Sequence, residues 1–89
     1  MTWHVASLIV RCRPEHEAAV ITRLDALDQT TVRGAERGRI VVLAEGTNEY
    51  ELAQRFDAIR ATQDVMTTDL VHHEIDTDEA EADHAQHAP

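Results

Sequence analysis

The residues with the most obvious capacity for chemistry are the histidines, because imidazole can bind a metal or carry a proton near neutral pH. His72 and His73 are adjacent in a segment that reads as a strand, where neighbouring side chains point to opposite faces, so they cannot share a metal. His84 and His87 are three residues apart, but the surrounding segment has no large apolar residue that could form a scaffold. We therefore predict no metal site.

Nucleophiles and phosphate-binding loops are also poorly represented. Ser7 is the only serine and Cys12 the only cysteine, so there is no CxxC pair. The sequence also places no general base beside either residue to activate it as a nucleophile. The glycines at 34, 38 and 46 stand at the ends of predicted strands and form no glycine-rich loop. We expect no catalytic residue and no cofactor, and hence a protein that is not an enzyme.

The apolar pattern predicts six elements in the order βαββαβ. Pro14 favours the first turn of a helix, and Asn48 followed by Glu51 is typical of a capped helix start. The predicted strands span 2–12, 30–34, 39–45 and 64–73, and the predicted helices span 14–27 and 48–61. This order indicates a ferredoxin-like α+β fold, with a four-stranded antiparallel sheet in the order 4-1-3-2 and both helices on one face.

Length and charge define the domain and its class of partner. The chain has 89 residues and a formal net charge of −9, and about two thirds of that charge falls in the last sixteen residues. We expect one ferredoxin-like domain over 1–74 and an acidic, disordered tail over 75–89. An acidic chain does not suit nucleic acid, whereas a cationic partner would fit. The lone cysteine and the absence of a signal or membrane-spanning segment predict a cytoplasmic protein.

The sheet face without helices is the candidate binding surface. Strand alternation assigns one set of residues to the helix-packed face: Ala6, Leu8, Val10, Val32, Ile40, Val42, Met66 and Leu70. The opposite face would carry Trp3, Val5, Ile9, Val41, Leu43 and Val71. An apolar patch of this size indicates either a binding surface or a surface covered by the tail or by a second copy.

Three stretches of the sequence resemble one known family. They are the opening Trp3-His4-Val5-Ala6-Ser7-Leu8-Ile9-Val10, the strand Gly38-Arg39-Ile40-Val41-Val42-Leu43-Ala44-Glu45, and the closing Asp64-Val65 through Leu70-Val71-His72-His73 before an acidic tail. Together they are similar to the NapD family over about residues 2 to 74. The central stretch 28–37 would match many sequences.

The resemblance implies a cytoplasmic chaperone that binds the twin-arginine signal peptide of the periplasmic nitrate reductase catalytic subunit. It would hold back export until the molybdenum cofactor has been inserted into the reductase, and would bind no cofactor itself. A basic pair followed by an apolar stretch is complementary to an apolar sheet flanked by acids. We expect the free protein to be a monomer.

The topology predicts where such a peptide would lie. Trp3, Glu45, His73 and Glu74 would meet at one end of the open sheet face, and Arg11, Arg33 and Arg39 at the other. The predicted peptide-binding residues are accordingly Trp3, Val5, Ile9, Val41, Leu43, Glu45, Val71 and His73. Docking of the peptide as a helix on the sheet and as a strand added at the edge formed by 30–34 both stay open.

A second interpretation uses the same face for self-association. In it, the chain is a small ferredoxin-like regulatory domain that dimerises through its sheet and binds a small effector at the interface. The fold class is compatible with both functions, so the fold by itself does not separate them.

Overall fold

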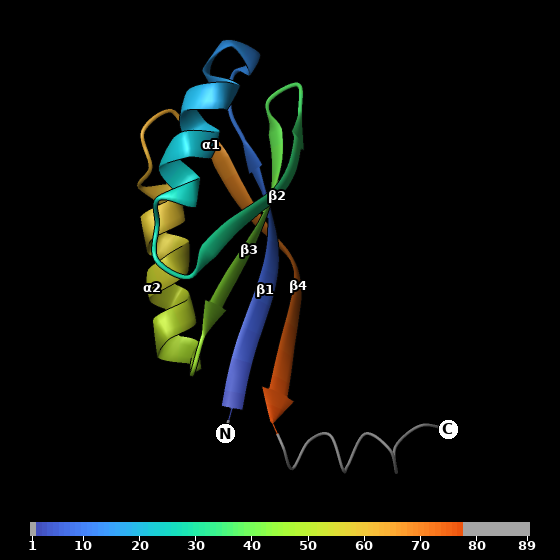
Figure 1. Cartoon of the computed structure of the whole chain (residues 1–89), viewed down its shortest axis with the longest axis vertical. Coiled ribbons are helices and arrows are strands. Elements are labelled where there is room, and N and C mark those ends of the chain that lie inside the picture. Colours follow the sequence, from blue (N-terminus) through green and yellow to red (C-terminus); the bar gives the residue numbers. More distant parts are fainter. Residues whose placement is uncertain (1, 78–89) are drawn as a thin grey trace, which may run out of the picture.

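The computed structural model describes residues 2–77, and the predicted tail from 78 onward lies outside the described residues. The elements in chain order are β1 (Thr2–Arg11), a 3₁₀ turn η1 (Pro14–His16), α1 (Glu17–Asp25), β2 (Thr30–Glu36), β3 (Arg39–Gly46), α2 (Glu49–Arg60) and β4 (Thr67–Thr77). Figure 1 shows these elements along the chain.

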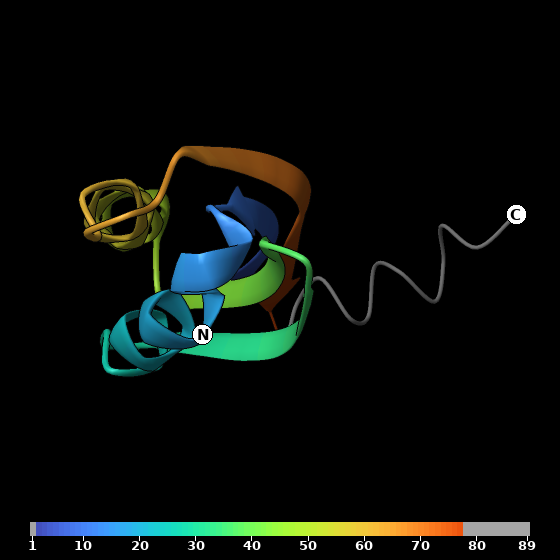
Figure 2. The ribbon, with the colours of Figure 1, turned by 90° about the horizontal axis from the view of Figure 1, so that it is seen from above.

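The four strands form one antiparallel sheet in the order β2-β3-β1-β4, which confirms the predicted order read from the opposite edge. Both helices lie on the same side of this sheet (Figure 2). The predicted ferredoxin-like α+β fold is therefore confirmed. The central strands are β1 and β3, and β4 and β2 form the two edges.

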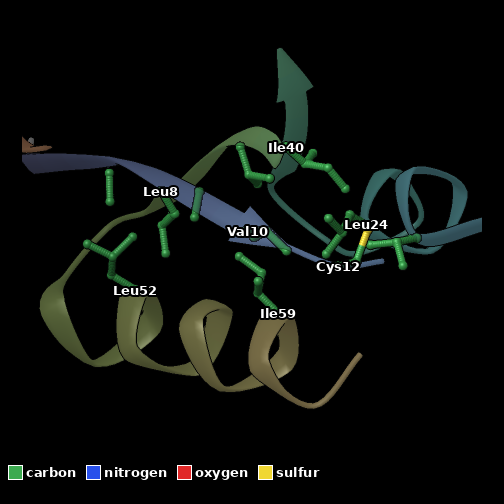
Figure 3. Close-up of a cluster of buried hydrophobic side chains, with 11 residues drawn as sticks. Leu8, Val10, Cys12, Leu24, Ile40, Leu52 and Ile59 are labelled. Carbon is green, nitrogen blue, oxygen red and sulfur yellow. The ribbon is translucent and has the colours of Figure 1, made fainter. Parts of the chain in front are cut away.

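The core lies between the sheet and the two helices. Alternate residues of β1 and β3 point into it, and α1 and α2 contribute Val20, Leu24, Leu52 and Ile59 (Figure 3). The buried apolar residues of these two strands are Ala6, Leu8, Val10, Ile40, Val42 and Ala44. Burial of these side chains supplies most of the drive to fold, since each large aliphatic side chain contributes about 1.5–3 kcal/mol when removed from water. The predicted face assignment of β1 and β3 is thus correct.

A tight hairpin joins β2 to β3 at one end of the sheet. Arg37 and Gly38 form its two-residue turn, with φ of 54° and 82°. Two positive φ values are what a two-residue hairpin turn of this twist requires. A Cβ at Gly38 would also stand 2.2 Å from the carbonyl oxygen of Cys12, so glycine is needed there. The turn sets the position of Arg39, the first residue of β3.

The first helix begins later than predicted. Residues Pro14–His16 form a 3₁₀ turn, and regular α-helix runs only over Glu17–Asp25. The N-cap residue His16 makes no side-chain capping hydrogen bond, so the start of the α-helix has no strong local signal. The helix therefore covers a shorter length than 14–27.

The last strand lies further along the chain than predicted, over Thr67–Thr77 instead of 64–73. Asp64 has φ of +73° and its carboxylate binds Arg23 at 2.9 Å, so this residue belongs to a turn that ties the end of α2 to α1. At the other end the strand continues through the acidic residues because Thr2–Val5 of β1 pair with Glu74–Thr77.

Two residues predicted to pack under the helices are exposed instead. Met66 is 65% exposed and Leu70 is 53% exposed. Leu70 does pair with the buried Leu8, so it lies on the predicted face of the sheet. However, β4 is an edge strand with a neighbour on one side only, and Met66 precedes it. Residues on that face of β4 consequently remain accessible to water.

Candidate peptide-binding face

The sheet face away from the helices, called the open face below, carries a cluster of carboxylates at one end. Val5 of β1 lies between Glu45 of β3 and Glu74 of β4 in the strand register. Asp76 pairs with Trp3 one step further along the same face. Three carboxylates thus surround Trp3 and Val5, and we call this group the acidic end.

One contact orders two of these side chains. The indole Nε1–H of Trp3 donates a hydrogen bond of 2.8 Å to Oε1 of Glu45. Both side chains are only half-buried. The bond holds the indole ring against the carboxylate and leaves Oε2 of Glu45 available to another donor.

The centre of the open face is apolar and the far end is basic. Ile9 pairs with Val41, and Leu43 pairs with Ser7, so these side chains form a continuous surface across β1 and β3. Arg11 then pairs with Arg39 at the last position of the ladder. Along the central strands β1 and β3 the face thus passes from Glu45 through aliphatic groups to two arginines, while the edge strands add Asp69 beside Ile9 and Glu36 beside Arg39.

Two surface hollows coincide with the two ends. The hollow at the acidic end has a volume of about 280 Å³ and is lined by Trp3, Val5, Glu74, Ile75 and Asp76. The hollow at the basic end has about 310 Å³ and is lined by Gly34, Ala35, Glu36, Arg39 and Val41. Each hollow is large enough for one or two peptide side chains, and both contain charged groups that could orient them.

Most of the predicted site residues lie together on this face. Trp3, Val5, Ile9, Val41, Leu43 and Glu45 share it, as the alternation of β1 and β3 predicted. Their role in binding stays a prediction. Arg33, which was expected at the basic end, is the unpaired residue in an irregularity of β2 between Val32 and Gly34.

The predicted position of His73 on the open face is wrong. β4 has a bulge between its pairings Leu8–Leu70 and Ser7–His72, where Val71 is the extra, unpaired residue. One extra residue reverses the faces of everything that follows it. His72 therefore lies on the open face, His73 lies on the helix side with Ala6, and Val71 is not part of a regular row.

His73 instead meets a buried histidine of β1. His4 is 5% exposed, and its Nδ1 lies 3.0 Å from Nε2 of His73. The ring centroids are 5.2 Å apart, so the two nitrogens face each other head-on. That geometry is typical of a hydrogen bond in which the rings share one proton, whereas two ligands of one metal would converge on a third point.

Sequence reasoning missed one member of the acidic end. Asp76 was assigned to the tail because the strand was expected to end at 73. Strand length gave no signal, because the predicted strand 64–73 already had the ten residues of β1; only the register against β1 brings Asp76 to Trp3.

Other chemistry finds little support in the part of the chain that the structure describes. Burial, with Glu17 nearby as the next cause, raises the pKa of the Cys12 thiol, which disfavours the reactive thiolate. Residues 2–77 contain no group of three or more metal-binding side chains. Over the same range, no helix has the length and apolar character needed to cross a membrane.

Fold and face together define a small ferredoxin-like domain whose uncovered sheet is acidic at one end, apolar in the middle and basic at the other end. Residues 3–77 match the family model described as NapD protein. The chain belongs to the NapD family, as the three sequence stretches indicated.

Individual relatives agree with this assignment. The chain is 29% identical over 76 residues to the Chaperone NapD of Haemophilus influenzae, covering 83% of this chain and 82% of the relative. It is 32% identical over 80 residues to the Chaperone NapD of Paracoccus pantotrophus, covering 89% of this chain and 71% of that protein. Among solved structures, the solution structure of the E. coli Tat proofreading chaperone protein NapD superimposes with a TM-score of 0.76 at 25% identity, covering 86% of this chain and 82% of that one.

Proposed function

We propose that this protein is a cytoplasmic chaperone that binds the twin-arginine signal peptide of the periplasmic nitrate reductase catalytic subunit. By occupying the signal peptide, it restrains export of the reductase until its cofactor has been inserted. The protein performs no catalysis and holds no cofactor in this role. Family membership supports the proposal, as do the two relatives named as chaperones and the neighbour described as a Tat proofreading chaperone.

The observation that carries the proposal is the cluster of Glu45, Glu74 and Asp76 around Trp3 at the end of an apolar surface. A twin-arginine peptide presents two guanidinium groups followed by an apolar stretch. Guanidinium forms paired hydrogen bonds with carboxylates and stacks on indole, so the acidic end can receive the arginines. The apolar stretch would then cover Ile9, Val41 and Leu43.

Titration calorimetry with synthetic peptides tests this function. A peptide carrying the twin-arginine motif and its apolar stretch should bind as a 1:1 complex, and the same peptide with lysines in place of both arginines should bind more weakly. Leu43→Asp should abolish binding of both peptides, because it places a charge in the apolar centre. Absence of binding to wild-type protein would contradict the proposed function.

A sizing column separates this function from the regulatory-domain interpretation. The chaperone should elute as a monomer without peptide, with its open face available. A stable dimer whose open face becomes accessible only after dissociation would favour the regulatory domain.

A further inference from the structure

The helix side of β4 carries two exposed apolar side chains, Leu70 and Ile75, with His73 between them in the same row. Leu70 pairs with Leu8 and Ile75 pairs with His4, so both lie on the helix side of the sheet. They are nevertheless 53% and 47% exposed, whereas Leu8 and His4 are buried. The buried core is built from β1, β3 and the two helices and includes no residue of β4, which forms one edge of the sheet (Figure 1).

The same strand offers a long edge of backbone hydrogen-bonding groups. β4 is the last strand of the sheet order, and no other strand within residues 2–77 pairs with its outer side. Beyond the bulge, His72–Thr77 pair without interruption with Ser7–Thr2 of β1. A regular edge of six residues is long enough to take an additional strand, because main-chain hydrogen bonds supply affinity along its whole length.

The charged side chains along this edge indicate which kind of strand could pair with β4. Asp69, Glu74 and Asp76 lie on the open-face side of β4. Within residues 2–77 none of them pairs with an arginine, and on this row a carboxylate oxygen of Glu74 lies 3.6 Å from Nε2 of His72. A second copy of β4 would bring these carboxylates against their own kind, whereas basic residues would neutralise them.

The opposite edge of the sheet does not share this character. The irregularity in β2 interrupts its ladder at Arg33, and Arg37 stands in the turn beside it. Glu36 of this strand already lies 4.0 Å from Arg37, so the edge carries both signs of charge. Both edge strands contain one irregularity, but β4 keeps six consecutive pairings beyond it, whereas β2 keeps three on either side of its own.

We propose that the edge of β4 is a second interaction surface, which binds an extended protein segment of alternating basic and apolar residues by strand addition. The basic side chains of the added strand face Glu74 and Asp76, and its apolar side chains face Leu70 and Ile75. The surface uses none of the apolar residues in the centre of the open face. It shares Glu74 and Asp76 with the acidic end of the open face, so an added strand and a twin-arginine peptide would compete for these two carboxylates.

Amide hydrogen exchange on the full chain tests this proposal. The probe is a nine-residue peptide that alternates Arg and Val, and its control has the same composition with Arg and Val in two separate blocks. The alternating peptide should slow exchange of outward-facing amides within His72–Thr77 by roughly tenfold or more, because strand addition gives them hydrogen-bond acceptors. The block peptide should not, and neither peptide should protect β2.

Matched variants then locate the contact. The double substitution Leu70→Lys with Ile75→Lys should weaken binding of the alternating peptide by roughly tenfold, because it removes both apolar contacts and adds like charge. Both positions are half-exposed, so the fold should persist, which circular dichroism verifies. Tyr50→Lys, on α2 and 73% exposed, is the control and should have no effect.

Three results would overturn the proposal. One is equal protection by the alternating and block peptides, and a second is protection of β2 in place of β4. The third is a chain that dimerises without peptide and becomes monomeric in the Leu70→Lys/Ile75→Lys variant, since that would make the edge a self-association surface. Absence of twin-arginine peptide binding to the wild-type chain would contradict the function proposed for the open face, and strand addition is judged separately by the protection of His72–Thr77.

Discussion

The Nε1–H of Trp3 and Oε1 of Glu45 form a 2.8 Å hydrogen bond between β1 and β3, although the residues are 42 positions apart in sequence. The bond places an aromatic ring and a carboxylate side by side on the open face. It also makes Trp3, the single tryptophan of the chain, a fluorescence reporter for any group that approaches Glu45.

Glu45→Gln should weaken binding of a twin-arginine peptide by roughly tenfold or more, because a desolvated charge-assisted hydrogen bond contributes about 1.5–3 kcal/mol. The same change should affect a twin-lysine peptide less, since lysine lacks the planar pair of donors. Calorimetry with both peptides, or quenching of Trp3, provides the measurement. Equal losses for the two peptides would remove Glu45 from the arginine site.

Neighbouring substitutions in β3 should separate stability from binding. Val42 is fully buried, so Val42→Asp places an unpaired charge in the core and should unfold this small domain. Leu43 is half-buried on the open face, and Leu43→Asp should leave the domain folded but unable to bind peptide. Thermal melts followed by peptide titration check both. The reverse pattern would show that the faces are exchanged.

Adjacent histidines in β4 should differ in their effect on stability. His73→Ala removes the partner of the buried His4 ring and should lower the free energy of unfolding by about 1 kcal/mol. His72→Ala, whose side chain is 62% exposed on the other face, should change it by less than about 0.5 kcal/mol. Urea denaturation provides both values. A larger loss for His72 would contradict the bulge at Val71.

Acidic pH should destabilise the N-terminus of α2, because it protonates the carboxylate of Glu51. Hydrogen bonds from the Thr47 backbone N–H and hydroxyl lower the pKa of this carboxyl below its ordinary value of 4.5. A lowered folded-state pKa means that the stabilisation is fully present above about pH 4.5 and is lost as the pH falls through the folded value. Glu51→Gln should therefore flatten the fall in melting temperature below pH 4.5. Glu49→Gln, in the same turn, is the control and should keep the wild-type slope.

Two truncations should locate the end of the folded domain. Removing 78–89 deletes four acidic residues, two histidines, a glutamine, alanines and a proline but no large apolar side chain, so the melting temperature should change little. Removing everything after His73 also deletes the strand residues that pair with Thr2–Val5, so this truncation should lower the melting temperature. A large loss from the shorter deletion would show that residues beyond Thr77 pack on the domain.

The amino-acid sequence by itself determined the order of elements, the sheet order and the faces of the two central strands. These strands alternate regularly between apolar and polar environments, so local pattern and tertiary position agree. The N-terminus of α2 was equally readable, since the Asn48 side chain accepts from the Glu51 backbone N–H at 2.8 Å as the capping signature predicts.

Only the tertiary structure decided the arrangement of β4. Nothing local in its sequence shows that Val71 is an extra residue, because a bulge is defined by the register against β1. That register moved His73 to the helix side, brought Asp76 to the acidic end and carried the strand to Thr77. As an edge strand, β4 has one partner and little burial, so its residues carry a weak apolar signal. Pairing with β1 nevertheless holds Ile75–Thr77 in the strand, although their acidic surroundings predicted a disordered segment.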